Sequence, residues 1–305
     1  MASALGAIPT VSAATITIMD SSSCGSIGGS WSSGTCTLST SYTLTSGNAL
    51  EIPSGTTLVI GASGTIVNDG TITVDSGGVL TIQSSNLDYG IQNYGTINVA
   101  GTANLENTAY YSIWNPGTIT NTGTINVKTS GSFGTIGIYS IFLSATQAGV
   151  ITNSGVINVE NTGSTYGIYS GIATITNTGI INVENSGELG IYSISSTFTN
   201  TAPGRIDVEN TGAYGIDNNG PLTNTGTITV GPAPDAILNQ ATITNECGGV
   251  INGPGTIVGG YTQVSGCAPT GVPEFPISGL GPLLLSAMLL PVLVIMSRRF
   301  RASSP

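Results

Sequence analysis

A short unit, ATITNTGIINVEN at residues 173–185, recurs in near copies along most of this chain. Its signature is Ile or Leu, any residue, Asn, any residue and Gly, followed after one further residue by Ile, then Asn or Thr, then Val. Copies occupy residues 66–74, 91–99, 119–127, 151–159, 175–183 and 222–230. Such self-similarity is typical of solenoids, in which each repeat packs only against its neighbours. The repeat therefore constrains the fold more than any other feature of the sequence.

The central Ile of the Ile-x-Val element recurs at a spacing typical of solenoids. Two further short apolar runs, of the Ile-Thr-Asn and Gly-Ile-Tyr-Ser types, separate successive copies of this element. Three short strands per coil predict a parallel β-helix, in which each strand pairs with its counterpart about 4.8 Å away. Within a strand we expect Ile and Val to point inward and the residue between them outward. The copies, at spacings of 25, 28, 32, 24, 25, 22 and 23 residues, are Ile72, Ile97, Ile125, Ile157, Ile181, Ile206, Ile228 and Ile251.

Asparagines at the turns predict a second inward column. A side-chain amide carries two donors and an acceptor oxygen, so stacked copies can bond to one another and to turn backbone. This Asn ladder resembles the one in the pectate-lyase-like right-handed β-helix family, and the likeness, which is one of architecture, covers most of residues 48–258. It implies an all-β fold with one right-handed parallel β-helix over that range. The expected members are Asn68, Asn93, Asn121, Asn153, Asn177, Asn200, Asn224 and Asn245.

The composition agrees with such a solenoid and excludes some partners. With 44 Gly, 7% charged and 6% aromatic residues, the chain departs from an ordinary layered domain. Abundant Ile, Val and Thr favour strands over helices and over disorder. A net charge of −10 argues against a nucleic-acid partner, because neutralising phosphates requires a cluster of Lys and Arg. No such cluster precedes residue 298.

Four cysteines lie as two pairs, one near each end of the repeats: Cys24 with Cys36, and Cys247 with Cys267. In an exported protein four cysteines predict two disulfides, with three connectivities open. Local pairing, Cys24–Cys36 and Cys247–Cys267, closes each end separately, and four buried free thiols are the alternative. A metal site at these cysteines is disfavoured, because the chain has no His and no Cys-x-x-Cys spacing.

Both ends of the chain indicate export. Residues 1–14 are weakly apolar and end in Ser-Ala-Ala, which predicts a truncated signal peptide, with a disordered lead as the alternative. We expect an N-terminal cap over residues 15–47, and a C-terminal cap with a short linker over 259–272. As a helix, the uncharged run 277–296 spans about 30 Å, the thickness of a bilayer core, and basic residues follow it. We therefore predict a transmembrane helix there.

Residues 272–301 resemble the PEF-type C-terminal sorting signal of archaeal surface proteins, the substrates of archaeosortases. A short motif, an apolar helix and a basic end follow one another close to the C-terminus, with an uncleaved single-span anchor as the alternative. The resemblance implies two partners, an archaeosortase-like processing enzyme and a membrane lipid anchor. It also implies an extracellular, membrane-anchored location at the cell surface. The residues that carry it are Pro273, Glu274, Phe275, Pro276, Arg298, Arg299 and Arg301.

The sequence offers few groups for catalysis, and we predict that the protein is not an enzyme. It has no His, and Lys128 and Arg205 are its only cations before the tail, three coils apart at different points of the coil. They cannot share a lyase site. Three glutamates, each directly after a Val, are predicted to form a column with about 5 Å between neighbours: Glu160, Glu184 and Glu209.

This acidic column is the only candidate metal or cofactor site in the sequence. A divalent cation turns repulsion between neighbouring carboxylates into attraction, and carboxylate, Asn and carbonyl oxygens suit Ca²⁺. We hypothesise weak calcium binding by the three glutamates, with solvated carboxylates as the alternative.

The predicted function is a structural or adhesive role at the cell surface, with other surface proteins or glycans as partners. A surface β-helix that binds or degrades polysaccharide is the alternative from another class. A minor alternative comes from outward Thr-x-Thr pairs, which resemble the flat arrays of ice-binding solenoids but are interrupted at Val150 and Pro221. An outward aromatic stack is also predicted, as structural support, from Trp114, Tyr139, Tyr169 and Tyr192.

Overall fold

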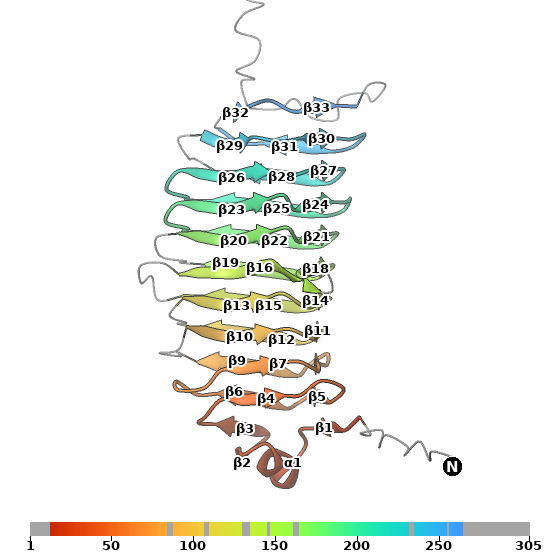
Figure 1. Cartoon of the computed structure of the whole chain (residues 1–305), viewed down its shortest axis with the longest axis vertical. Coiled ribbons are helices and arrows are strands. Elements are labelled where there is room, and N and C mark those ends of the chain that lie inside the picture. Colours follow the sequence, from red (N-terminus) through yellow and green to blue (C-terminus); the bar gives the residue numbers. More distant parts are fainter. Residues whose placement is uncertain are drawn as a thin grey trace, which may run out of the picture.

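The computed structural model of this chain describes residues 13–83, 88–106, 110–129, 135–144, 147–160, 165–231, 235–254 and 256–264. Within these ranges the chain winds into a parallel β-solenoid, which Figure 1 shows as a stack of coils. Each coil gives one strand to each of three 11-stranded sheets, named here A, B and C. The predictions of an all-β parallel solenoid and of three strands per coil are confirmed.

The chain visits the sheets in the order A, B, C. Sheet A contains β1 (Thr15–Thr17), β5 (Ala49–Ile52), β8 (Thr71–Val74), β11 (Thr96–Val99), β14 (Thr118–Asn121), β18 (Val150–Asn153), β21 (Thr174–Asn177), β24 (Thr197–Asn200), β27 (Leu222–Asn224), β30 (Ile243–Asn245) and β33 (Thr262–Gln263). Sheet B contains β2 (Ser30–Ser32), β3 (Thr35–Leu38), β6 (Thr57–Ile60), β9 (Val79–Gln83), β12 (Thr102–Glu106), β15 (Thr124–Lys128), β19 (Val156–Glu160), β22 (Ile180–Glu184), β25 (Arg205–Glu209), β28 (Thr227–Val230) and β31 (Val250–Asn252). Sheet C contains β4 (Tyr42–Leu44), β7 (Ile66–Asn68), β10 (Tyr89–Asn93), β13 (Tyr111–Asn115), β16 (Ile136–Ser144), β20 (Tyr166–Gly171), β23 (Leu189–Ile194), β26 (Tyr214–Asn219), β29 (Asp235–Asn239) and β32 (Ile257–Val258), and the short β17 (Gln147–Ala148) pairs with β16.

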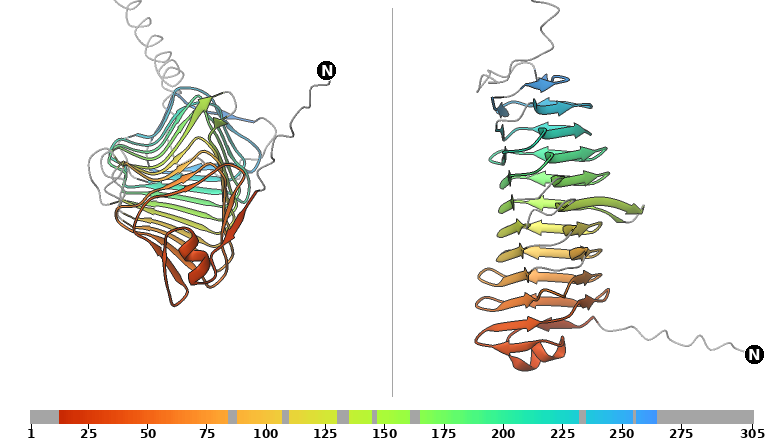
Figure 2. Two further views of the ribbon diagram at one scale, coloured as in Figure 1. Left: turned by 60° about the horizontal axis from the view of Figure 1, so that its bottom comes forward. Right: turned by 90° about the vertical axis from the view of Figure 1, so that its left-hand side faces the viewer.

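Most strands pair in parallel with the strand one coil away, so identical positions of successive coils stack. The antiparallel pairs are β2 with β3 and β16 with β17, and the second of these forms a hairpin. In Figure 2 the end of β16 projects beyond the neighbouring coils. This hairpin carries much of the extra length of the 32-residue coil between Asn121 and Asn153.

Aliphatic side chains fill the interior of the solenoid. In β15, Ile125 and Val127 are each 1% exposed, while Asn126 between them is only half-buried, as the alternation of strand side chains requires. The same inward pair recurs one coil on as Ile157 and Val159. Each fully buried side chain of this kind contributes about 1.5–3 kcal/mol through removal of apolar surface from water. The predicted inward stack of Ile and Val is therefore confirmed.

The predicted Asn column is two ladders on two sheets rather than one. Asn68 and Asn93 end strands of sheet C, and their ladder continues to Asn115 through amide bonds of 2.7 Å. The second ladder ends strands of sheet A and links its members through amide bonds of 2.7–2.8 Å. Its members are Asn121, Asn153, Asn177, Asn200, Asn224 and Asn245. The single predicted column was wrong, because similar Asn-containing turns form both the corner from C to A and the corner from A to B.

The same ambiguity affects the repeat signature itself. Its copies at residues 66–74 and 91–99 run from sheet C into sheet A, whereas the copy at 119–127 runs from A into B. Ile72 and Ile97 are consequently in register with Ile119, and not with Ile125. Ile97 lies in sheet A and Ile125 in sheet B, so the spacing of 28 residues between them is not a coil length.

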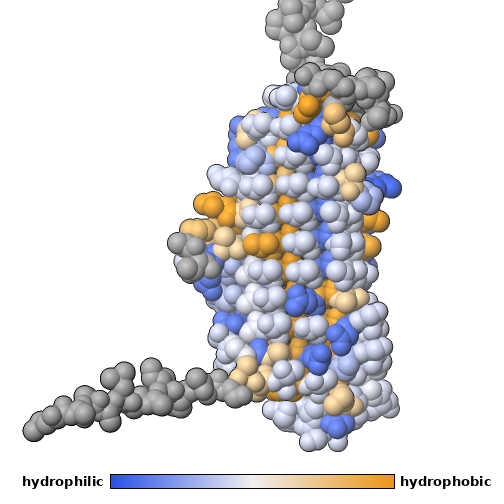
Figure 3. Space-filling view, turned by 90° about the vertical axis from the view of Figure 1, so that its right-hand side faces the viewer, coloured by the Kyte–Doolittle hydropathy of each residue, from blue (hydrophilic) through white to orange (hydrophobic). Residues whose placement is uncertain are grey.

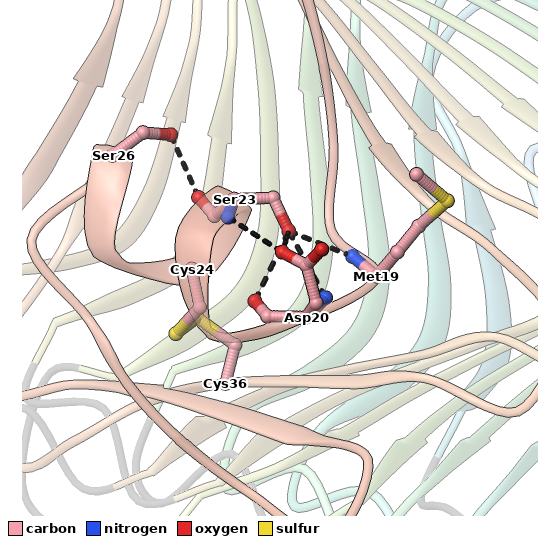
Figure 4. The surroundings of a disulfide bond; sticks show 6 residues. All are labelled: Met19, Asp20, Ser23, Cys24, Ser26 and Cys36. Carbon is pink, nitrogen blue, oxygen red and sulfur yellow. Dashed lines mark hydrogen bonds between the residues drawn. A yellow bond between two sulfur atoms is a disulfide. The ribbon is translucent and has the colours of Figure 1, made fainter.

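The N-terminal end of the core is covered by a short helix and a disulfide. The helix α1 (Ser21–Ser26) begins with a capping box between Asp20 and Ser23, and Cys24 on its buried side bonds to Cys36 of β3, as Figure 4 shows. The predicted Cys24–Cys36 pair is confirmed. Residues 15–47, predicted as a cap, also supply the first strands of all three sheets.

Several sequence predictions fall outside the residues that the structure describes. These are nearly all of the predicted signal peptide, the linker up to residue 272, Cys267 with its predicted bond to Cys247, the sorting motif and the basic tail. The predicted transmembrane segment 277–296 also lies there. Within the described ranges, the structure contains no helix of the length and apolarity needed to cross a membrane.

Candidate functional site

The acidic column lies along the outer edge of sheet B. Backbone register places Glu160, Glu184 and Glu209 opposite one another at the last position of β19, β22 and β25. The stacking of these three residues is therefore confirmed. The column continues below through Lys128 and Glu106. Lys128 thus stands between Glu106 and Glu160, so negative and positive side chains alternate in this part of the column.

Both cations of the described chain face acids on sheet B. Lys128 Nζ lies 3.8 Å from Glu160 Oε2, with the two side chains 64% and 43% exposed, so the pair contributes at most about 1 kcal/mol. Arg205 forms an ion pair with Asp207 two residues further on in the same strand. The two cations lie at opposite ends of strands three steps apart in the sheet, as predicted. They do not converge on a common substrate position.

The calcium hypothesis stays a prediction. Among the residues for which side chains are described, no three acids or cysteines come close enough together to share a metal ion. Glu184 and Glu209 are exposed to solvent, and Glu160 is the one drawn toward Lys128. Backbone register thus supplies the column, but the side chains do not form a ready ligand group.

Sheet C carries a continuous chain of aromatic rings on its outer face. Neighbouring ring centroids are 4.6–5.7 Å apart, and the angles between ring planes run from 15° to 85°. We name this the aromatic ladder. Tyr89 and Tyr111 stack face to face, and the other pairs are tilted or edge-on, so the rings support one another from coil to coil. Its members are Tyr89, Tyr94, Tyr111, Trp114, Tyr139, Tyr166, Tyr169 and Tyr192.

The predicted aromatic stack contains four of the eight rings of this ladder. The backbone register of Trp114, Tyr139, Tyr169 and Tyr192 is as predicted. A second set of rings, such as Tyr166, stands three residues earlier on the same strands, because the Gly and Ile between the two tyrosines are both buried. Strict period-two alternation places Tyr166 and Tyr169 on opposite faces, so it cannot find the second set. The available signal was the recurrence of Tyr-Gly-Ile, at residues 89–91, 166–168 and 214–216.

One buried acid ends the aromatic ladder. Asp217 of β26 is in register with Tyr192, is 8% exposed, and accepts hydrogen bonds from Gln240 Nε2 at 3.1 Å and Asn219 Nδ2 at 3.3 Å. Burial raises the pKa of its carboxyl above the ordinary value, and the bond from Gln240 acts in the opposite direction. Asp217 was not predicted from the sequence, since only the packing of neighbouring coils buries it.

The raised pKa of Asp217 predicts a pH-dependent contribution to stability. A carboxyl whose pKa is higher in the folded chain favours folding when protonated; this contribution is complete below about pH 4 and is lost as the pH rises through the folded value. We expect Asp217→Asn to raise the free energy of unfolding at neutral pH and to flatten its dependence on pH. Urea unfolding between about pH 4 and pH 7 measures this. Glu184→Gln, which changes an exposed acid, is the control, and equal pH slopes for wild type and Asp217→Asn contradict the prediction.

Sheet A presents a flat outer face formed almost wholly of Thr. From β8 to β30, eight successive coils place two outward residues side by side, and the only ones that are not Thr are Asn98, Val150 and Pro221. None of these outward residues is charged. Figure 3 shows them as two columns of near-neutral side chains. The array is more extensive than the isolated Thr-x-Thr pairs suggested.

Comparison with known proteins gives no family for this chain. No protein-family model, no curated protein and no solved structure matches it. Its function must therefore be inferred from its own residues.

Proposed function

We propose that this protein is an exported archaeal rod with a structural or adhesive role, held at the cell surface by its C-terminal segment. The observation that best supports the proposal is the continuity of the solenoid. Three sheets run the length of the described chain around one filled core, and their ladders tie each coil to the next. A continuous solenoid of this kind is stiff, so it suits a structural or adhesive role. The right-handed winding, the sorting signal and the transmembrane helix complete the proposal.

The chemistry of the described surface supports a non-catalytic role. A hydrolase or lyase needs an acid, a base and a group that stabilises developing charge, all within reach of one substrate atom. The buried acid Asp217 lies on sheet C, whereas the acidic column and both cations lie on sheet B. A surface of Thr and Asn with few charges suits contact with other surface molecules.

Labelling of intact cells tests this proposal. An antibody against the solenoid is expected to bind intact cells of the native host as strongly as lysed cells, and mild external protease is expected to remove the signal. The mature protein is expected to lack residues 277–305, as cleavage at the sorting signal requires, and mass spectrometry measures this. An antibody against a cytosolic enzyme is the control. Labelling that appears only after lysis contradicts the proposed location.

Glycan binding is the second candidate function, and the aromatic ladder favours it. Aromatic rings beside hydrogen-bonding groups, here Asp217, Asn219 and Gln240, can recognise sugars through apolar contact and hydroxyl bonds. Against it, the ladder rings already pack against one another, as Tyr89 does against Tyr111 and Tyr139 against Tyr169. Retarded migration in gels containing a soluble polysaccharide, lost in Tyr169→Ala, supports this candidate, and release of reducing sugar supports the degrading enzyme.

A further inference from the structure

The charges of this acidic protein are distributed unequally over its three faces. On sheet B, the strands from β12 to β25 carry Glu106, Lys128, Glu160, Glu184 and Glu209 among others. On sheet A, the eight strands from β8 to β30 carry no charged residue. Sheet C carries two acids, Asp217 in β26 and Asp235 in β29. With a net charge of −10, two copies of this chain repel each other less when sheet A faces sheet A than when sheet B faces sheet B.

One edge of this uncharged face is apolar and exposed. Phe142 and Leu143 are 42% and 46% exposed on the β16–β17 hairpin, and Ile172, directly after β20 one coil on, is 56% exposed. They project where the chain turns from sheet C into sheet A, and we name them the apolar corner. Figure 3 shows apolar side chains projecting at this edge of the face. Contiguous apolar patches on a surface are typical of sites that contact another molecule.

The backbone at Ile172 supports a role outside the fold of one copy. Its φ of 51° lies in the left-handed region, which is costly for a β-branched residue, by about 1–3 kcal/mol. Ser195 takes the same conformation one coil later with a small polar side chain. Neither burial nor backbone preference explains an Ile at this position.

We propose that the apolar corner and the Thr face of sheet A together form a surface that pairs two copies of this chain side by side. The occupant is a second copy because the face is complementary to itself. Each Thr hydroxyl both donates and accepts a hydrogen bond, so two identical Thr faces can satisfy each other. A two-fold arrangement also buries both apolar corners in one interface. An acidic or basic partner finds no opposite charge there.

The size of the surface predicts a weak, reversible contact. Eight strands of about four residues cover roughly 450 Å² on each copy, against about 800 Å² per partner in a standard stable complex. The apolar corner adds to this area and supplies its anchoring side chains. Rods held in one membrane meet at a high effective concentration, which turns a weak contact into stable lateral association. The lateral association of anchored rods therefore rests on the proposed function at the cell surface, although the pairing of two copies does not.

Sedimentation velocity of the purified full-length chain over a concentration series tests the proposal. We expect a reversible dimer with a dissociation constant of about 10–100 μM, as suits an interface below standard size. Raising the salt concentration from about 0.05 to 0.5 M is expected to strengthen it, because screening reduces the repulsion between acidic copies. Ile172→Lys is expected to weaken it at least tenfold, and so is Thr176→Lys in the middle of the Thr face.

Ile180→Lys is the matched control, because Ile180 is an Ile of 38% exposure at the start of β22 on sheet B. It adds the same charge but leaves the face intact, so the dimer is expected to persist. Unchanged circular dichroism spectra verify that each variant is folded. A wild type that stays monomeric, or equal weakening by Ile172→Lys and Ile180→Lys, overturns the proposal. Labelling of intact cells can succeed while this pairing fails, so the two results remain distinguishable.

Discussion

Asn177→Leu is expected to lower the free energy of unfolding by about 3–5 kcal/mol, because it removes a fully buried link of the sheet A ladder. The Asn177 Nδ2 donates to Asn200 Oδ1 at 2.8 Å and to the Arg205 carbonyl at 3.1 Å, and its oxygen accepts from Asn153 at 2.8 Å. Leu has nearly the same shape but satisfies none of these groups. Each buried group left without a partner costs about 1–3 kcal/mol. Urea unfolding followed by circular dichroism measures the loss.

Asn182→Leu is the matched control for this ladder. Asn182 donates to Asn158 at 2.8 Å in a similar chain of amides, but this chain lies on the outer face of sheet B, where Asn182 is only half-buried. Water can replace its lost bonds, so the expected cost is below about 1 kcal/mol. A similar cost for both variants contradicts the view that burial makes the inner ladder important.

Gly179→Ala is expected to destabilise the solenoid by at least about 3 kcal/mol, because successive coils approach each other too closely at this turn for a Cβ. A methyl group at Gly179 collides with the Gly155 carbonyl oxygen and with the backbone of Ser154, and neither atom is free to move. The φ of Gly179 is not in the left-handed region, so close packing rather than backbone conformation requires glycine there. Thermal and urea unfolding of the purified variant measure the effect.

Gly25→Ala in α1 is the control for that substitution. A Cβ at Gly25 meets no atom within 4 Å, and Ala favours a helix over Gly. We expect this variant to be as stable as wild type or more stable by up to about 1 kcal/mol. If Gly179→Ala were equally well tolerated, the turns would have to be more loosely packed than the structure shows.

Much of the fold was predictable because its rules are local. The alternation of Ile125, Asn126 and Val127 fixes which side chains enter the core, whatever the rest of the chain does. The Cys24–Cys36 bond was one of the open connectivities, and it was favoured because these two cysteines lie 12 residues apart at one end of the solenoid. The stacking of Glu160, Glu184 and Glu209 was also predictable, because these copies of the repeat all occupy the same sheet.

The candidate surfaces were less predictable, because they depend on neighbours from different coils. Tyr166 and Tyr169 share a face only because Gly167 and Ile168 are both buried between them. Asp217 is ordinary in sequence and becomes buried through packing beside Tyr192 and Gln240. The apolar corner arises where the β16–β17 hairpin projects next to the turn at Ile172, and no periodic pattern marks it.

The sequence by itself determined that the chain forms short strands, three to a coil, with Ile, Val and the Asn of the turns inside and with Thr at the surface. Only the tertiary structure decided which corner each Asn-Gly turn occupies, and hence that Asn93 and Asn121 belong to different ladders. The physical reason is that a turn signal is local, and the same signal serves two corners equally well. The corner that a turn occupies is set by strand pairing with the next coil, 21–32 residues away. In that pairing the inward Ile and Val must stack on those of the next coil, and each turn Asn must bond to the Asn of its own ladder.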